Sequence, residues 1–281
     1  MDTKLQLRTY RRWDGLTADA VALLTSARED PFAIPLLVSP STAHARAVGQ
    51  AVADEVGVAA GLQGKTASAL RRELSQSLLD MDPQVDPWSG SALTLRIFDL
   101  LRPDDPNMAA VSEHVQACRV RGIAHADWTT AQQFSAVLQS LIHHSPAVLE
   151  QWRAGEDVDA EGSALPWDKA WWPHVWRLLH DDGHPDPMTQ LTRLCSALGA
   201  APLRWPSCVW ISPAAPEWQD YSLAQALSRR IPVTVLHLLP ACAEHSRWEP
   251  FNSVREHTNL RWHECVQQCG GQAHDHCDHA D

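Results

Sequence analysis

Basic residues and lysine in particular are scarce in this chain of 281 residues. Asp and Glu outnumber Lys and Arg by 34 to 23, which gives a formal net charge of −11. The only lysines are Lys4, Lys65 and Lys169. Because sequence-independent binding of a nucleic-acid duplex needs a basic footprint, the composition excludes a general duplex-binding protein. Any DNA contact must come from a local patch or be shared with other chains.

Long apolar runs are missing as well. No stretch approaches the length of a membrane span, and the amino-terminal MDTKLQLRTYRRWDG lacks the apolar segment of a signal peptide. The seven Cys are odd in number and scattered, which is typical of reduced thiols rather than of a disulfide framework. We therefore expect a cytoplasmic protein without a membrane partner.

The chain does contain the alternating strand and helix patterns of an α/β fold. Short apolar or alternating runs predict strands at 4–10, 34–38, 207–212 and 231–239, with a further candidate at 56–60. Helices are predicted at 14–28 and 216–229. A third predicted helix begins at Ser41 or Thr42, runs to about Glu55 and is terminated by Gly57. Between 67 and 200 the pattern is helical, with candidate helices at 67–80, 91–101, 107–118, 128–144, 146–153, 167–180 and 187–198.

This order predicts an open parallel sheet with helices on its faces. Residues 1–66 and 203–250 would form the α/β core, and residues 67–202 a large all-helical insertion. Residues 251–281 would form a tail.

Several segments, in the same order along the chain, resemble the N-terminal part of the RecC family, the gamma chain of exodeoxyribonuclease V. The first combines an apolar strand, a loop with Ser and Thr, a helix and Gly57-Val58-Ala59-Ala60. The second combines Phe134 with the helix from Pro146 to Trp152, and the Trp-rich helix follows. The third is the pair of strands PSCVWIS and IPVTVLHLL, continued by Cys242 and Trp248. The resemblance covers residues 4–250.

The resemblance implies a fold of the P-loop-helicase type that has lost its ATPase motifs. It also implies a place in a RecBCD-like helicase–nuclease of DNA repair and recombination, in which RecC guides unwound single strands and helps to sense the recombination signal Chi. RecB-like and RecD-like subunits would be the partners and would handle ATP and Mg²⁺. We expect no autonomous catalysis from this chain. The chain departs from the family at Arg46 and Ala47, which replace a Gln-Trp pair that faces DNA there.

Candidate DNA-binding residues follow the predicted strands. Loops after parallel strands meet at the carboxyl edge of the sheet, where open α/β sheets bind ligands. A role in contacting backbone phosphates is reasonable there, and solvated surface arginines are the equally weighted alternative. The candidates are Ser39, Ser41, Thr42, Arg46, Thr66 and Arg72.

Residues 59–66, AAGLQGKT, nearly form a P-loop. In that motif, backbone N–H groups hold phosphates, a Lys contacts the β- and γ-phosphates, and a hydroxyl binds Mg²⁺. Gly64, Lys65 and Thr66 would then make the chain a stand-alone ATP-binding protein. Against this alternative, no convincing apolar strand ends in acidic residues that could hold the metal. We favour a loop that leads into a helix.

The tail and a Trp-rich segment each carry one further hypothesis. Cys265, Cys269, His274 and Cys277 offer enough ligands for a tetrahedral Zn²⁺ site, which would make the tail a zinc-dependent interaction module. Because the Cys-x2-Cys pair is missing, we favour a disordered tail with incidental metal binding, and we expect no other cofactor. The tryptophans at 167, 171, 172 and 176 could stack bases, but we favour packing in a core or an interface.

Overall fold

The strands form one parallel sheet in the computed structural model, which describes residues 5–26, 34–59, 61–62, 64–82, 86–101, 108–181, 183–213, 217–238, 262, 264–268 and 270–275. The strands are β1 (Leu5–Tyr10), β2 (Leu36–Val38), β3 (Gly64–Lys65), β4 (Cys208–Ser212), β5 (Val233–Leu238) and β6 (Gln272–Asp275). Within the described residues their order is β3-β2-β4-β5-β1-β6, and every pairing is parallel. The α/β class with a parallel sheet is confirmed, and the strands predicted at 34–38, 207–212 and 231–239 lie side by side in it as β2, β4 and β5.

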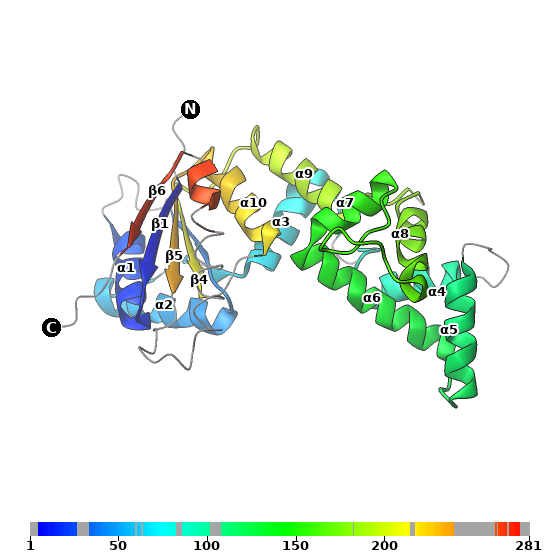
Figure 1. Ribbon diagram of the computed structural model, residues 1–281. Coiled ribbons are helices and arrows are strands. Elements are labelled where there is room, and N and C mark those ends of the chain that lie inside the picture. The colour runs from blue at the N-terminus through cyan, green and yellow to red at the C-terminus, as the bar shows by residue number, and fades with distance from the viewer. Residues whose placement is uncertain are drawn as a thin grey trace, which may run out of the picture. The chain divides into compact units, whose positions relative to one another are not determined.

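Helices cover both faces of this sheet (Figure 1). The helices α1 (Trp13–Thr25) and α2 (Thr42–Val56) pack together on one face, and α10 (Trp218–Ser228) lies on the other. Right-handed crossovers require this division, because β1 to β2 to β3 runs in one direction along the sheet and β4 to β5 runs in the opposite direction. The core between sheet and helices is aliphatic, with Leu16, Leu24, Leu37, Val48 and Leu236 fully buried.

The ends of α2 follow the predicted signals. The Ser41 hydroxyl accepts a hydrogen bond from the His44 N–H at 3.2 Å, so Ser41 is the N-cap. Gly57 ends the helix with a left-handed φ of 82°. The strand predicted at 56–60 is wrong, because Val56 is still helical and Val58 is 69% exposed. The edge strand β3 forms instead at Gly64–Lys65, where it pairs with β2.

The chain divides into two compact units, Met1–Met81 with Arg193–Asp281, and Asp82–Thr192. The first unit contains the sheet and also α3 (Ala67–Leu79), which the sequence analysis assigned to the helical insertion. The second unit contains α4 (Gly90–Leu100), α5 (Ala109–Val120), α6 (Ala126–His144), α7 (Pro146–Ala154), the 3-10 helix η2 (Trp167–Lys169) and α8 (Trp171–Asp181). In sequence, α9 (Pro187–Leu198) spans the boundary. None of the described helices has the length and apolar character needed to cross a membrane.

Buried tryptophans hold the helical unit together. Trp176 is fully buried, and its Nε1–H donates to the Leu149 carbonyl at 3.0 Å. Trp171 is also buried and packs against Phe134 at 4.7 Å between ring centroids. The interpretation of these two rings as core residues is confirmed. The single helix predicted over 167–180 is wrong, because η2 precedes α8 and Trp167 on η2 remains 60% exposed.

Candidate functional site

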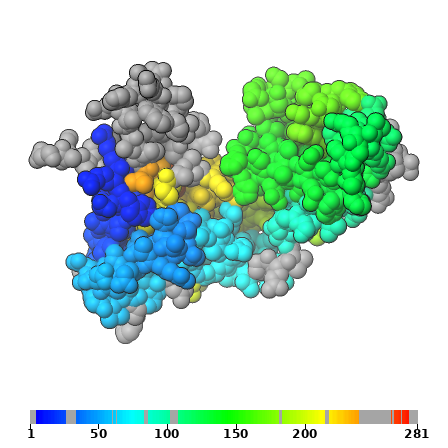
Figure 2. Space-filling model, turned by 90° about the horizontal axis from the view of Figure 1, so that it is seen from below, coloured from blue at the N-terminus to red at the C-terminus, as the bar shows by residue number. Residues whose placement is uncertain are grey.

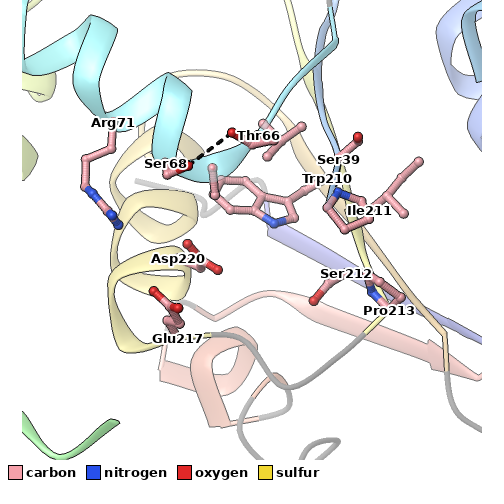
Figure 3. A pocket seen from close by; sticks show the side chains of 13 residues that line it. Ser39, Thr66, Ser68, Arg71, Trp210, Ile211, Ser212, Pro213, Glu217 and Asp220 are labelled. Atoms are coloured by element: carbon pink, nitrogen blue, oxygen red, sulfur yellow. Dashed lines mark hydrogen bonds between the residues drawn. The ribbon is translucent and has the colours of Figure 1, made fainter. Parts of the chain in front are cut away.

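A pocket lies at the carboxyl edge of the sheet, between β2 and β4. From these adjacent strands the chain continues in opposite directions, to β3 and to β5, and such switch points open a crevice in parallel sheets. The pocket has a volume of about 260 Å³. Its lining comes from the ends of β2 and β4, the start of α3 and the start of α10, as Figure 3 shows. The lining residues are Val38, Ser39, Pro40, Thr66, Ala67, Ser68, Arg71, Trp210, Ile211, Ser212, Pro213, Glu217 and Asp220.

The hydroxyl groups of the pocket are tied to the local backbone or to neighbouring side chains. Ser39 donates its hydroxyl to the Ser41 carbonyl at 2.6 Å, which shapes the turn after β2. Thr66 is the N-cap of α3, because its hydroxyl accepts the Ala69 N–H at 3.2 Å. Ser212 accepts the Trp262 indole N–H at 3.2 Å. These contacts define a preformed pocket whose walls come from segments far apart in the sequence.

The charges of the pocket are mixed. Arg71 reaches from α3 toward the side on which Glu217 and Asp220 lie, at the start of α10 (Figure 3). Two carboxylates and one guanidinium leave an excess of negative charge, which disfavours a phosphate inside the pocket. Trp210 adds an aromatic wall. The pocket therefore suits a group that both donates and accepts hydrogen bonds.

The six DNA-binding candidates divide between the pocket and the surface around it. Ser39 and Thr66 line the pocket. Ser41 caps α2, and Thr42 and Arg46 are exposed on that helix outside the pocket. Arg71 lines the pocket, and its neighbour Arg72 does not. Their role in DNA binding stays a prediction.

Sequence reasoning missed other residues of the pocket. Ser212 follows the strand predicted at 207–212, so the carboxyl-edge rule that selected Ser39 applies to it equally. Glu217 and Asp220 could have been found at the start of the helix predicted at 216–229. No local pattern pointed to Trp210, because a Trp in an apolar strand indicates a core residue. The ring is indeed buried, at 3% exposed, and it borders the pocket from the core side.

The residues of the near-P-loop have structural partners. Gly64 and Lys65 themselves form β3, and only Thr66 separates them from α3. The Lys65 ammonium pairs with the Glu73 carboxylate, which also accepts from Arg204 at 2.7 Å. A P-loop instead needs a Gly-rich loop between strand and helix, with a Lys directed at phosphates. This geometry does not favour the nucleotide alternative.

The connection after β1 is also too short to form a P-loop. It consists of Arg11 and Arg12 alone. Near the end of β1, Arg8 donates to both carboxylate oxygens of Asp19 on α1, at 2.8 and 2.9 Å. The Tyr10 hydroxyl donates to the same carboxylate, and burial together with that carboxylate raises the pKa of Tyr10. This network joins the end of β1 directly to α1.

Replacing Lys65 with Ala tests the structural role of this side chain. We expect the free energy of unfolding to fall by about 1 kcal/mol, because Glu73 loses its less exposed partner. Arg204→Ala is the matched control and should have a smaller effect, since Arg204 is 64% exposed. Urea unfolding would measure both. Titration calorimetry of the unaltered chain should show no Mg-ATP binding, and saturable binding that Lys65→Ala abolishes would contradict this assignment.

The candidate zinc ligands are only partly described. Cys265 is buried and directs its thiol to the Tyr221 carbonyl at 3.9 Å. His274 lies on β6, a strand that the sequence analysis did not predict. Cys269 and Cys277 lie outside the described residues. Within the part of the chain that the structure describes, no three His, Cys, Asp or Glu side chains form a group that could hold a metal, and the zinc hypothesis stays a prediction.

Comparisons with known proteins identify a family. The family model "RecC, N-terminal domain" matches residues 5–272. The RecBCD enzyme subunit RecC of Mycolicibacterium smegmatis is 25% identical over 192 residues, which is 65% of this chain and 16% of that protein. The protein of the same name from Mycobacterium tuberculosis is 26% identical over 199 residues, which is 65% of this chain and 17% of that protein. The chain therefore spans only a small part of the length of these relatives. Because the family model covers nearly all of its residues, the chain belongs to the RecC family.

Proposed function

We propose that this chain is a non-catalytic scaffold and DNA-guiding part of a RecBCD-type, ATP-dependent helicase–nuclease that acts in double-strand-break repair and recombination. The observation that carries the proposal is the match of the RecC N-terminal family model to residues 5–272. The relatives are named as subunits of the RecBCD enzyme. RecB-like and RecD-like subunits would then be the partners, and these would supply the motor and the nuclease.

The strand-to-helix connections support a role without ATP hydrolysis. A P-loop needs eight residues with two Gly and a Lys between a strand and a helix. The connection is Arg11–Arg12 after β1, Ser39–Ser41 after β2 and Thr66 after β3. None of these three described connections has that length or composition. We infer that the sheet is of the helicase type. It would position DNA strands and partner subunits and would not hydrolyse ATP itself.

The pocket at the carboxyl edge supports a path for a single strand. Single-stranded nucleic acid is bound by aromatic surfaces and by basic groups along its backbone. Trp210 lies in the pocket wall, although only 3% of its surface is exposed there. Arg46 is exposed on α2, the helix that follows the β2 turn. Unwound strands would pass over the turns that follow β2, β3 and β4, with bases toward the pocket. Phosphates would remain outside, nearer to Arg46 and Arg72.

Co-purification from the native host tests the proposed function. A tag on this chain should recover a RecB-like helicase–nuclease in a stable complex, together with a RecD-like subunit. Mass spectrometry identifies the recovered subunits, and size-exclusion chromatography with light scattering gives their stoichiometry. The same tag on an unrelated host protein is the control. A chain that elutes alone, with neither subunit in the tagged fraction, would contradict the proposal.

A further inference from the structure

A tryptophan stands at the surface of the helical unit, directly after the loop that joins α7 to η2. Trp167 is 60% exposed, although Trp is highly buried on average in folded proteins. Figure 2 shows the green and yellow-green segments of the helical unit, to which this loop belongs, at the surface of the molecule. The neighbours of Trp167 in the chain are also apolar and at least half-exposed to solvent or partly buried, and they are Ala164, Leu165, Pro166 and Ala170.

The loop, residues 155–166, is held in one conformation by contacts of its own. Val158 and Ala164 form an antiparallel bridge. The Asp159 carboxylate accepts two backbone N–H groups of the loop, at 3.0 and 2.8 Å. The buried Trp152 indole donates to the Val158 carbonyl at 2.7 Å, which fixes the loop to α7. A surface segment that is ordered before binding loses little conformational entropy when a partner docks on it.

The loop and η2 carry an excess of negative charge. Two cations lie close to them, because Arg177 pairs with Asp157 at 2.8 Å and Lys169 lies over the Trp172 ring at 5.2 Å. Five carboxylates less these two cations leave three negative charges. The five carboxylates are Glu156, Asp157, Asp159, Glu161 and Asp168.

The nearest helix does not neutralise this charge. Around α5, which contacts η2, two acidic residues balance two basic ones, namely Glu113 and Asp127 against Arg119 and Arg121. Among the described residues, Glu156, Glu161 and Asp168 form no ion pair. An exposed aromatic ring on an ordered segment is therefore surrounded by unpaired carboxylates.

We propose that residues 155–170, which we call the Trp167 surface, dock onto a partner subunit that offers an apolar socket for the indole and a rim of Lys or Arg around it. This inference rests on the assembly proposed above. An aromatic side chain that enters a socket contributes a large share of the binding energy of an interface. The rim follows from charge complementarity. The same carboxylates repel a phosphate backbone, so the ring does not suit the stacking of single-stranded bases.

Trp167→Ala tests the anchor in the complex recovered from the host. We expect the affinity between the tagged chain and the purified partner subunit, measured by biolayer interferometry, to fall by about tenfold or more. Leu95→Ala is the matched control, because Leu95 is 51% exposed on α4 and lies outside the Trp167 surface. It should leave the affinity unchanged. Both side chains are exposed, so the melting temperature should change by no more than about 2 °C.

Charge reversal tests the rim. Glu161→Lys combined with Asp168→Lys should weaken the association at low salt. Salt should weaken the binding of the unaltered chain, because it screens opposite charges, whereas it should strengthen the binding of the doubly reversed chain. Glu55→Lys is the control, because Glu55 is exposed on α2 in the other unit. It should keep the salt dependence of the unaltered chain.

Two outcomes would overturn the proposal. One is a Trp167→Ala chain that binds the partner subunit as tightly as the Leu95→Ala control does. The other is a Trp167→Ala chain that loses affinity for a fluorescently labelled oligothymidylate while its association with the partner is unchanged, because the ring would then stack on bases. Either result leaves the proposed function standing, whereas an unaltered chain that recovers no partner overturns both.

Discussion

Replacing Trp176 with Ala is expected to lower the free energy of unfolding by about 3–5 kcal/mol, the range for a fully buried aromatic residue. The Trp176 ring packs against Trp88 at 5.4 Å between ring centroids and is completely removed from solvent. Truncation would leave a cavity, and it would also leave the Leu149 carbonyl without its indole donor. A buried acceptor without a partner adds to the loss.

Urea unfolding followed by far-ultraviolet circular dichroism measures this effect. Trp167→Ala is the control, because this ring is 60% exposed on η2 and belongs to the same Trp-rich segment. We expect the control to change the free energy of unfolding by less than about 0.5 kcal/mol. Equal losses for the two variants would show that burial does not distinguish them and would contradict the core assignment of Trp176.

Replacing Gly64 with Ala is expected to destabilise the sheet by about 1–3 kcal/mol through overpacking. A Cβ atom at this position would lie 2.3 Å from the Ala45 Cβ and 3.2 Å from the Ala45 Cα. Neither atom belongs to the flexible end of a long side chain, so β3 or α2 must move. This close approach explains the glycine of the Gly-Lys-Thr sequence without a phosphate.

A compensating substitution separates this explanation from a phosphate-binding role. Ala45→Gly removes the atom that clashes, so the double variant should recover most of the stability lost by Gly64→Ala, although Gly in a helix costs about 0.5–1 kcal/mol. Gly49→Ala is the control, because nothing lies within 4 Å of its added Cβ. It should stabilise α2 slightly. Thermal and urea unfolding measure the stability of the Gly64→Ala, Ala45→Gly and Gly49→Ala variants and of the double variant, each against the unaltered chain. A double variant that recovers none of the stability lost by Gly64→Ala would contradict the packing explanation.

The elements that sequence patterns predicted well are those whose stabilising signals are local. The strands β2, β4 and β5 are buried apolar runs, and such runs are typical of parallel sheets. Ser41 and Gly57 mark the ends of α2 because capping depends on residues within one turn. The resemblance to the RecC family was also carried by the order of such segments, and the family match confirms it.

The candidate site could be predicted only in part. The rule for carboxyl edges located Ser39 and Thr66, because the rule needs only the ends of strands. It could not choose Arg71 over Arg72, since that choice depends on how α3 is rotated against its neighbours. The rule also could not predict that Asp220 and Ser39 line the same pocket, because the strand order that places them together is a property of the whole fold.

By itself, the sequence determined the α/β class, the strands β1, β2, β4 and β5 of the described sheet, and membership of the RecC family. The tertiary structure decided that Gly64–Lys65 becomes an edge strand, that Lys65 pairs with Glu73 and that β6 joins β1. It also decided where the pocket lies and that Trp167 stays exposed. The physical reason is the range of the interactions. Hydrophobic periodicity and capping act within a few residues, whereas strand pairing, ion pairs and close packing join residues that lie far apart in the sequence.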